Sequence, residues 1–328
     1  MSRIKVSIIV ATYNAGKRIN PVIDSLTTQS FREKYEVILV DDGSTDDSLD
    51  ILKRIEKKNI KVRVFSQRNK GAAAARNFGI KKSRGEYIVI SDDDVILGKD
   101  WLKKNIPILK NKKKGIIYSV IKNVPKKDMT ALQSLLFDYA MTSRDANENN
   151  EGLMLMTNAV RKEIFKEVGL YDESFDSSGA GADVDLVYRI LDEGYELAFS
   201  DVKSIHLEEN QRFDLKFFIK KPYSWGKALA KLVIRHKSKH MDIKNRIISY
   251  PFAVLAIAAA IILIILNHNF LILIPIGLLI YIYLRRNMIR KLLNRGRNIF
   301  EIMFLCILDV LRVIIYNLGA TSYYIFKK

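Results

Sequence analysis

The residues that most suggest chemistry are three acids directly after an apolar segment. Asp92, Asp93 and Asp94 follow the apolar residues 87–90. Such a run is typical of a strand buried in a sheet, and its carboxyl end lies where open α/β sheets bind ligands. The oxygens of Asp92 and Asp94 can converge on one Mg²⁺ or Mn²⁺ ion that keeps positions open for phosphate oxygens. This pattern favours a diphosphate substrate, with acids that only cap a turn as the alternative.

Strands and helices alternate around these acids, as in an α/β domain with a mostly parallel sheet and helices on both faces. Thr12–Asn14 and Asp41–Ser44 each follow an apolar strand, so they should meet the three acids beyond one edge of the sheet. The hydropathy pattern predicts strands at 6–11, 35–40, 61–65, 87–90, 116–121 and 196–199, and helices at 18–30, 48–57, 71–81, 130–141, 160–168 and 183–193.

Charge and hydropathy indicate that one part of the chain lies in water and another part in a membrane. Its formal net charge of +18 suits nucleic acid or an anionic membrane surface. The basic residues concentrate at 211–246, among aromatic residues and directly before apolar runs at 248–266 and 270–284. More arginines follow at 285–297, so a membrane hairpin with both ends in the cytoplasm is expected. Nucleic acid is not expected as a partner, and two buried helices of a soluble protein are the alternative.

We therefore expect a catalytic domain at 1–210 followed by membrane-associated parts. The single cysteine, Cys306, excludes an intramolecular disulfide, and the apolar run at 6–11 is too short for a secretory signal. Both observations indicate a cytosolic catalytic part. The later segments are expected to be interfacial helices at 211–246, a transmembrane hairpin at 247–284, a basic cytoplasmic loop at 285–298, and an apolar helix at 299–328 that either spans the membrane or lies on it.

Several motifs, taken in order, resemble those of the family 2 glycosyltransferases, which have the GT-A fold. Residues 6–14 resemble the opening strand of that family, and residues 40–46, Val-Asp-Asp-Gly-Ser-Thr-Asp, its nucleotide-binding second strand. Residues 71–79 are similar to the family segment that precedes the Asp-x-Asp acids. The resemblance covers residues 1 to about 210. It implies a Rossmann-like GT-A domain that binds a nucleotide sugar.

The resemblance also implies roles for individual residues. Asp94 would be the principal ligand of Mg²⁺ or Mn²⁺, and Asp92 would serve as a ribose contact or as a further metal neighbour. His206 matches a histidine near the metal in many members, although a lone histidine is more often structural. Arg76 would lie near the base or diphosphate, with a surface ion pair as the alternative. The nucleotide-binding set implied in this way is Thr12, Asn14, Asp41, Asp42, Arg76, Asp92 and Asp93.

Residues 179–189 resemble the acceptor-side motif of the family, in which Asp183 would be the general base. Ala182 stands where the family usually has Glu, so acceptor contacts inferred from the family are in doubt at this position. Asp183 could also cap the helix that follows, which is compatible with a catalytic role. Asp185 and Arg189 have the spacing of a structural ion pair on one helix.

The sequence thus predicts a membrane-anchored inverting glycosyltransferase with its catalytic domain on the cytoplasmic side. The donor is expected to be UDP-linked, and the acceptor a hydroxyl of a lipid-linked saccharide or another glycan. Asp183 favours a hydroxyl, because a lipid phosphate is already an anion and needs no base. A polyprenyl or dolichyl phosphate glycosyl synthase is the first alternative, and a non-catalytic membrane protein that binds nucleotide sugars is the second.

Overall fold

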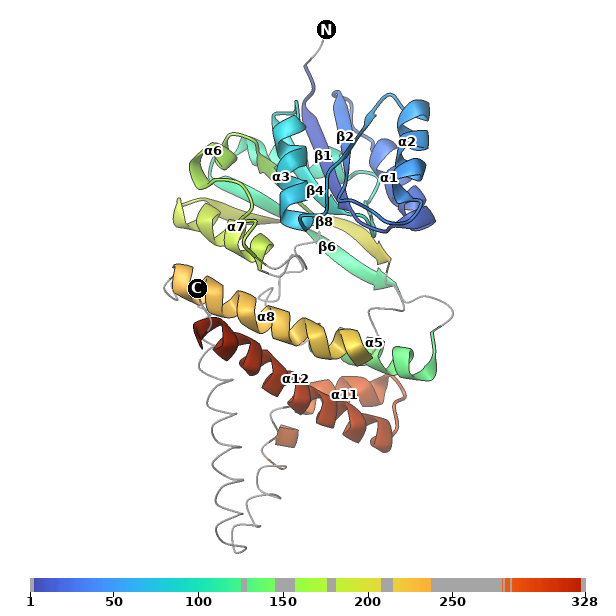
Figure 1. The fold of residues 1–328 in the computed structure, drawn as a ribbon, viewed down its shortest axis with the longest axis vertical. Helices are drawn as coiled ribbons and strands as arrows, with labels where there is room; N and C mark the ends of the chain where they lie inside the picture. The colour runs from blue at the N-terminus through green and yellow to red at the C-terminus, as the bar shows by residue number, and fades with distance from the viewer. Residues whose placement is uncertain are drawn as a thin grey trace, which may run out of the picture. The chain divides into compact units, whose positions relative to one another are not determined.

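The computed structural model describes residues 3–124, 129–144, 157–175, 181–207, 215–236, 279, 281–283 and 285–325 (Figure 1). The chain divides into two compact units. An α/β unit comprises Met1–Val124 and Met154–Glu208, and a helical unit comprises Pro125–Leu153 and Glu209–Lys328. The helix expected at 130–141 therefore groups with the C-terminal helices and not with the sheet.

The α/β unit contains one sheet of eight strands in the order β3-β2-β1-β4-β7-β6-β8-β5. Its strands are β1 (Val6–Thr12), β2 (Tyr35–Asp41), β3 (Val62–Ser66), β4 (Tyr87–Asp92), β5 (Val95–Ile96), β6 (Lys114–Val124), β7 (Thr157–Arg161) and β8 (Glu196–Leu207). Its helices are η1 (Gly16–Arg18), α1 (Ile19–Thr27), α2 (Ser48–Lys58), α3 (Ala72–Lys82), α4 (Trp101–Asn105), η2 (Ile106–Lys110), α6 (Ile164–Val168) and α7 (Ala182–Asp192).

The sheet is mixed, whereas the sequence predicted a mostly parallel one. Strands β1, β2, β3 and β4 are parallel, but β7 runs antiparallel to both β4 and β6. The prediction of a helix at 160–168 was wrong in its first part, because Thr157–Arg161 form β7 and only Ile164–Val168 are helical. All five residues of β7 are buried, and pairing with strands on both sides satisfies their backbone groups.

Alternate residues of each central strand serve opposite faces of the sheet. Ile8 and Val10 belong to a buried cluster that also contains apolar residues of α1, α2 and α4. Ile9 lies on the other face, where α3 packs so closely that a Cβ on Gly79 would lie 2.4 Å from the Ile9 Cγ2 atom. The period of two along the strand therefore explains why helices cover both faces.

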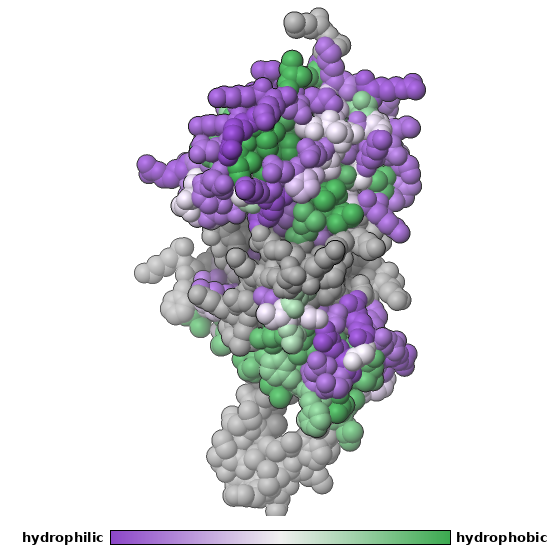
Figure 2. All heavy atoms as spheres, turned by 90° about the vertical axis from the view of Figure 1, so that its right-hand side faces the viewer, coloured by the Kyte–Doolittle hydropathy of each residue, from purple (hydrophilic) through white to green (hydrophobic). Residues whose placement is uncertain are grey.

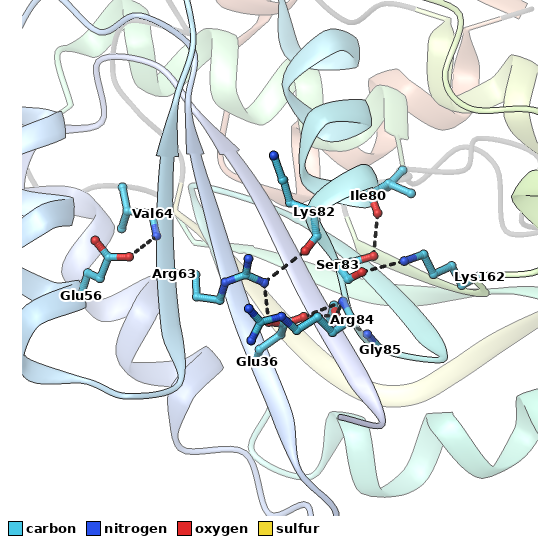
Figure 3. Close-up of polar contacts among 11 residues, drawn as sticks. Glu36, Glu56, Arg63, Val64, Ile80, Lys82, Ser83, Arg84, Gly85 and Lys162 are labelled. Atoms are coloured by element: carbon cyan, nitrogen blue, oxygen red, sulfur yellow. Dashed lines mark hydrogen bonds and ion pairs between the residues drawn. The ribbon is translucent and has the colours of Figure 1, made fainter. Parts of the chain in front are cut away.

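A buried carboxylate connects the strands at their amino-terminal edge. Glu36 of β2 accepts hydrogen bonds from Ser7 Oγ at 2.7 Å and from the Arg84 backbone N–H at 2.8 Å, and it forms an ion pair with Arg63 at 2.8 Å (Figure 3). Burial favours the neutral acid, but Arg63, Ser7 and the Arg84 N–H hold the pKa of Glu36 below its usual value. This network joins β1, β2, β3 and the turn before β4.

The helical unit is built from α5 (Ala131–Arg144), α8 (Leu215–His236), α11 (Arg286–Asn294) and α12 (Ile299–Ile325). Its buried apolar cluster combines three of these helices. The cluster contains Leu135, Leu136 and Tyr139 of α5, Met288 and Leu292 of α11, and Ile302, Leu305 and Leu308 of α12.

Helices α8 and α12 cross at two glycines. A Cβ on Gly226 would lie 1.9 Å from the Tyr316 carbonyl oxygen, and one on Gly319 would lie 2.1 Å from the Tyr223 carbonyl oxygen. Both contacts are with backbone atoms, which cannot turn aside as a side chain would. Only glycine therefore allows the two backbones to approach so closely.

The C-terminal membrane helices expected from the sequence are not found in the part of the chain that the structure describes. None of the helices described there has both the length and the apolar character needed to cross a bilayer. The hairpin expected at 247–284 lies outside the described residues, except for residues 279 and 281–283.

We expect Glu36→Gln to lower the free energy of unfolding by roughly 2–3 kcal/mol, because it leaves the Arg63 ion pair without its anion. Since the folded pKa of Glu36 lies below the unfolded value of about 4.3, its stabilisation is complete above that pH and is lost as pH falls through the folded value. Chemical denaturation at neutral and acidic pH measures both effects. The control Glu86→Gln removes a more exposed ion pair with Lys5 and should cost less than about 1 kcal/mol. Equal losses for the two variants would contradict this account.

We expect Gly319→Ala to destabilise the helical unit by roughly 1–3 kcal/mol, because the added methyl group forces α8 and α12 apart. Hydrogen exchange of the amides in α8 and α12 measures this loss directly. Thr321→Ala, at an exposed position of the same helix, should change exchange little. Unchanged protection in Gly319→Ala would show that the crossing can relax without loss.

Candidate active site

Three loops meet at the carboxyl edge of the parallel strands, as the sequence predicted. Thr12 at the end of β1 pairs with Asp41 of β2, and the preceding Ala11 pairs with Asp92 of β4. The Asp42 backbone N–H also donates to the Thr12 carbonyl oxygen at 2.9 Å. The strand register therefore places the polar ends of β1, β2 and β4 next to one another.

The loops after β1 and β2 are joined through Asn14. Its backbone N–H donates to Ser44 Oγ at 3.0 Å, and its Oδ1 atom accepts the Thr45 N–H at 2.8 Å. Asn14 has a φ of 52°, a left-handed conformation that Asn tolerates better than most residues. Its side chain thus shapes the loop in which the nucleotide was expected to bind.

Asp41 and Asp42 are both buried and both bind groups of their own chain. Asp41 accepts a hydrogen bond from Ser66 Oγ at 3.0 Å. Asp42 accepts the Gln67 side-chain amide at 2.8 Å and the backbone N–H groups of Lys70 and Gly71 at 3.0 and 2.8 Å. The Asp42 carboxylate therefore fixes the segment that leads into α3.

Asp93, the middle acid of the three, is held by two residues near the end of β1. Thr12 Oγ1 donates to it at 2.9 Å, and Arg18 lies 3.3 Å away in an ion pair. Burial raises the pKa of Asp93, while the Arg18 charge opposes that rise. Arg18 was not among the residues chosen from the sequence. It belongs to no motif there, so its place beside Asp93 follows from the fold alone.

Asp94 and His206 form a buried pair. Val95, the next residue after Asp94, is opposite His206 in the antiparallel pairing of β5 and β8. The His206 Nε2 atom lies 3.3 Å from the Asp94 Oδ2 atom, and the two residues are 0% and 1% exposed. Long-range strand pairing thus places these two residues side by side.

The donor set of Asp94 and His206 suits a divalent cation. One carboxylate oxygen and one imidazole nitrogen are ligands for Mn²⁺, and adjacent ligands of an octahedral ion lie about 3 Å apart. Asp92, expected as a ribose contact or a further metal neighbour, has its Oδ1 atom 2.8 Å from Arg76. Among the described residues, no three acid, histidine or cysteine side chains lie close enough together to hold a metal. Two protein ligands would leave the other positions for a diphosphate.

Arg76 of α3 joins two carboxylates that are far apart in the sequence. Its guanidinium lies 2.8 Å from Asp92 at the end of β4 and 3.0 Å from Asp183 at the start of α7. Its charge centre also lies 5.5 Å from the centre of the Tyr171 ring. Burial alone would lower the pKa of Arg76, but the two carboxylates hold it well above its usual value. The guanidinium therefore remains charged between them.

Asp183 is the acid whose surroundings best suit a general base. Burial raises the pKa of Asp183 to about 6, while Arg76 opposes the rise and Asp92 adds to it. A carboxylate of this basicity accepts a proton more readily than an ordinary aspartate. Ala182 beside it is fully buried, so the position where the family usually has Glu is closed to solvent here. Asp185 and Arg189 form the expected structural ion pair at 2.9 Å.

Comparisons with known proteins show which family and which fold the chain resembles. A family model described as Glycosyl transferase family 2 matches residues 7–169. Glycosyltransferase GlyG of Streptococcus pneumoniae is 31% identical over 177 residues, and the match covers 50% of this chain but only 58% of that relative.

Two solved structures also resemble this one. The mannosyltransferase PcManGT from Pyrobaculum calidifontis, in complex with GDP-Man and Mn²⁺, has a TM-score of 0.68 at 19% identity, covering 100% of this chain and 89% of that one. TarS 1–349 of S. aureus, in complex with UDP-GlcNAc, has a TM-score of 0.55 at 18% identity, covering 98% of this chain and 92% of that one. At these identities the likeness shows the fold. The chain therefore contains a family 2 glycosyltransferase domain with the GT-A fold.

Proposed function

We propose that this protein transfers a sugar from a nucleotide-sugar donor to a hydroxyl acceptor by a single displacement that inverts the anomeric configuration. The observation that carries this proposal is that Asp92 contacts one terminal nitrogen of the Arg76 guanidinium and Asp183 the other. Asp92 belongs to the donor side of the site and Asp183 to the acceptor side. One buried arginine thus connects the two half-sites of a transfer reaction.

The donor would bind across the loops after β1, β2 and β4. The site of the base and ribose would be lined by Thr12, Asn14, Asp41 and Asp42. Asp93 would hold Thr12 by a hydrogen bond and Arg18 by an ion pair. Structures similar to this one have been solved with GDP-Man and with UDP-GlcNAc. We propose a UDP sugar for this chain.

Asp183 would accept the proton of the acceptor hydroxyl through Oδ2, since Arg76 contacts its Oδ1 atom. As that proton moves to Asp183, the hydroxyl oxygen forms a bond to the anomeric carbon. The bond between this carbon and the diphosphate oxygen breaks on the opposite side. The nucleoside diphosphate leaves with the electron pair of the broken bond, and Asp183 later releases its proton to water.

Asp94 and His206 would hold a divalent cation on the donor side. Such an ion, when bound, offsets the negative charge that develops on the departing diphosphate. Asp92 would remain with Arg76, where it keeps the guanidinium in place between the half-sites. The leaving group then needs no acid from the protein.

We further propose that the protein works at the cytoplasmic face of the cell membrane on a lipid-linked saccharide or another glycan. The apolar run at 248–266 and the basic residues on both sides of the predicted hairpin support this location. A saccharide carried on a lipid would supply a hydroxyl acceptor at that surface. It would therefore suit both the membrane location and the presence of Asp183.

Asp183→Asn should lower kcat for transfer by roughly 10²- to 10⁴-fold and leave donor affinity nearly unchanged, because the amide cannot accept the proton. In the unchanged protein, kcat/KM should rise with pH and level off above an apparent pKa of about 6, since only the ionised carboxylate is active. Transfer assays across pH, together with calorimetric titration of the nucleotide, measure both quantities.

Glu193→Gln is the matched control for this variant, because it removes one negative charge from the exposed end of the same helix. It should leave the rate and the pH profile as they are. If Asp183→Asn transferred sugar at the normal rate, Asp183 would not be the base. A phosphate acceptor, as in a polyprenyl phosphate glycosyl synthase, would then be favoured.

His206→Ala should weaken the apparent affinity for Mn²⁺ by at least about tenfold, because it removes one of two protein ligands. Electron paramagnetic resonance of free Mn²⁺ measures metal binding without turnover. A separate assay, hydrolysis of UDP, GDP and dTDP sugars with and without Mn²⁺, identifies the donor. Asp201→Asn, at an exposed position of the same strand, is the control. Equal Mn²⁺ affinity in His206→Ala and the unchanged protein would remove His206 from the metal site.

A further inference from the structure

Helix α12 exposes an apolar stripe along much of its length. Phe300, Phe304, Ile307, Leu311 and Leu318 are between 40% and 79% exposed. At 3.6 residues per turn these positions lie on one side of the helix, and the stripe from the first to the last is about 27 Å long. Figure 2 shows hydrophobic side chains gathered on the surface of the helical unit. This stripe is too long to be the scattered apolar exposure found on most proteins.

The charged residues of α12 lie on its other sides and contact the rest of the helical unit. Asp309 is only 5% exposed, accepts a hydrogen bond from Tyr281 at 3.1 Å and forms an ion pair with Arg285 at 2.7 Å. It also accepts a hydrogen bond from Tyr139 of α5. The Asp309 carboxylate is therefore bound inside the helical unit.

The other two charges of α12 are also bound within the unit. Arg312 donates to the Tyr139 hydroxyl at 3.4 Å, and its charge centre lies 5.4 Å from the centre of the Trp225 ring. Glu301, near the beginning of the helix, forms an ion pair with Arg297 at 3.3 Å. None of the three charges therefore belongs to the exposed stripe.

A helix with charges inward and large apolar side chains outward has the reverse of the pattern that water favours. The acyl region of a lipid leaflet matches such a face, because it needs no charge or hydrogen bond from the stripe. A helix of this kind lies in the plane of the membrane surface with its apolar face toward the acyl chains. Helix α12 is not among helices able to cross a bilayer, although its outer face is apolar.

The basic residues just before α12 identify a lipid surface as its partner. Arg286 and Arg290 are exposed on α11, whereas Arg295, in the short turn that leads into α12, is exposed but forms an ion pair with Asp138 at 2.8 Å. Anionic lipid headgroups attract such a cluster beside an apolar helix. The apolar run at 248–266 in the same unit also fits a bilayer and would be out of place beside a water-soluble partner.

We propose that α12 lies within the surface of an anionic lipid leaflet, with the stripe of Phe300, Phe304, Ile307, Leu311 and Leu318 against the acyl chains. This inference rests on the proposed membrane association and specifies which face of which helix meets the lipid. It does not depend on the sugar-transfer reaction.

The full chain offers a direct test, because Cys306 is its only cysteine. In a Cys306→Ser background, Ile307→Cys, Leu311→Cys and Leu318→Cys are each labelled with an environment-sensitive fluorophore. Lys57→Cys, on α2 of the α/β unit, is the control. The proteins are mixed with phosphatidylcholine vesicles that contain phosphatidylglycerol and lipids bearing a nitroxide on the acyl chain. Flotation separately records whether the chain associates with the vesicles.

At the three α12 sites we expect the emission to shift to the blue, lipid nitroxides to quench it, and aqueous iodide to lose its effect. The Lys57→Cys label should respond only to iodide. Vesicle-bound protein whose α12 labels stay open to iodide would overturn this inference and leave membrane association intact. Labels shielded from both quenchers would indicate a second copy of the chain instead. If the chain did not float with the vesicles, the proposed membrane location would be wrong. If lipid quenching were retained but sugar transfer were absent, only the enzymatic proposal would be contradicted.

Discussion

The buried guanidinium of Arg76 is the interaction on which the candidate site depends. Two carboxylates share it, and its positive charge compensates both, although each carboxylate keeps part of its side chain exposed. The next residue, Asn77, exchanges two hydrogen bonds of 2.9 Å with the backbone of Tyr171, so α3 also holds the segment whose ring lies beside Arg76. Asp42 in turn binds the N–H of Gly71 just before α3. One helix therefore connects the nucleotide loops with the proposed base.

Three consecutive acids repel one another less because each has a different partner. Asp92 meets Arg76, Asp93 meets Thr12 and Arg18, and Asp94 meets His206. The end of β4 turns these neighbours in different directions, so their charges are compensated separately. Such an arrangement allows three adjacent residues to hold Arg76, the loop after β1 and His206. The same three acids on an exposed turn would have no such separate roles.

The helical unit combines a buried ionic cluster with an exposed apolar helix face. Its interior contains an ionic cluster around Asp309, and its surface along α12 is apolar. The close crossing of α8 and α12 at Gly226 and Gly319 adds tight packing that needs no large side chains between the helices. Small residues at such crossings are common where helices meet in lipid. Together with the buried apolar cluster of α5, α11 and α12, these polar contacts and the close backbone packing hold the unit together.

Much of the α/β unit could be predicted, because local patterns indicate buried strands and amphipathic helices. The strands before Thr12, Asp41 and Asp92 had clear apolar runs, and parallel strands necessarily bring their carboxyl ends to one edge. Strand β7 was missed, because a five-residue run can be read as strand or helix until its partners are known. The functional roles of the predicted site residues stay predictions until they are measured.

The amino-acid sequence by itself determined most strands and helices of the α/β unit, though not β7, and the polar residues that end them, since these depend on neighbours within a few positions. The tertiary structure alone decided that Arg76 joins Asp92 to Asp183, that Arg18 binds Asp93, and that His206 meets Asp94. It also decided that the charged side of α12 packs inside the helical unit. These contacts join residues far apart in the chain. They therefore depend on strand order and helix packing, which no local pattern specifies.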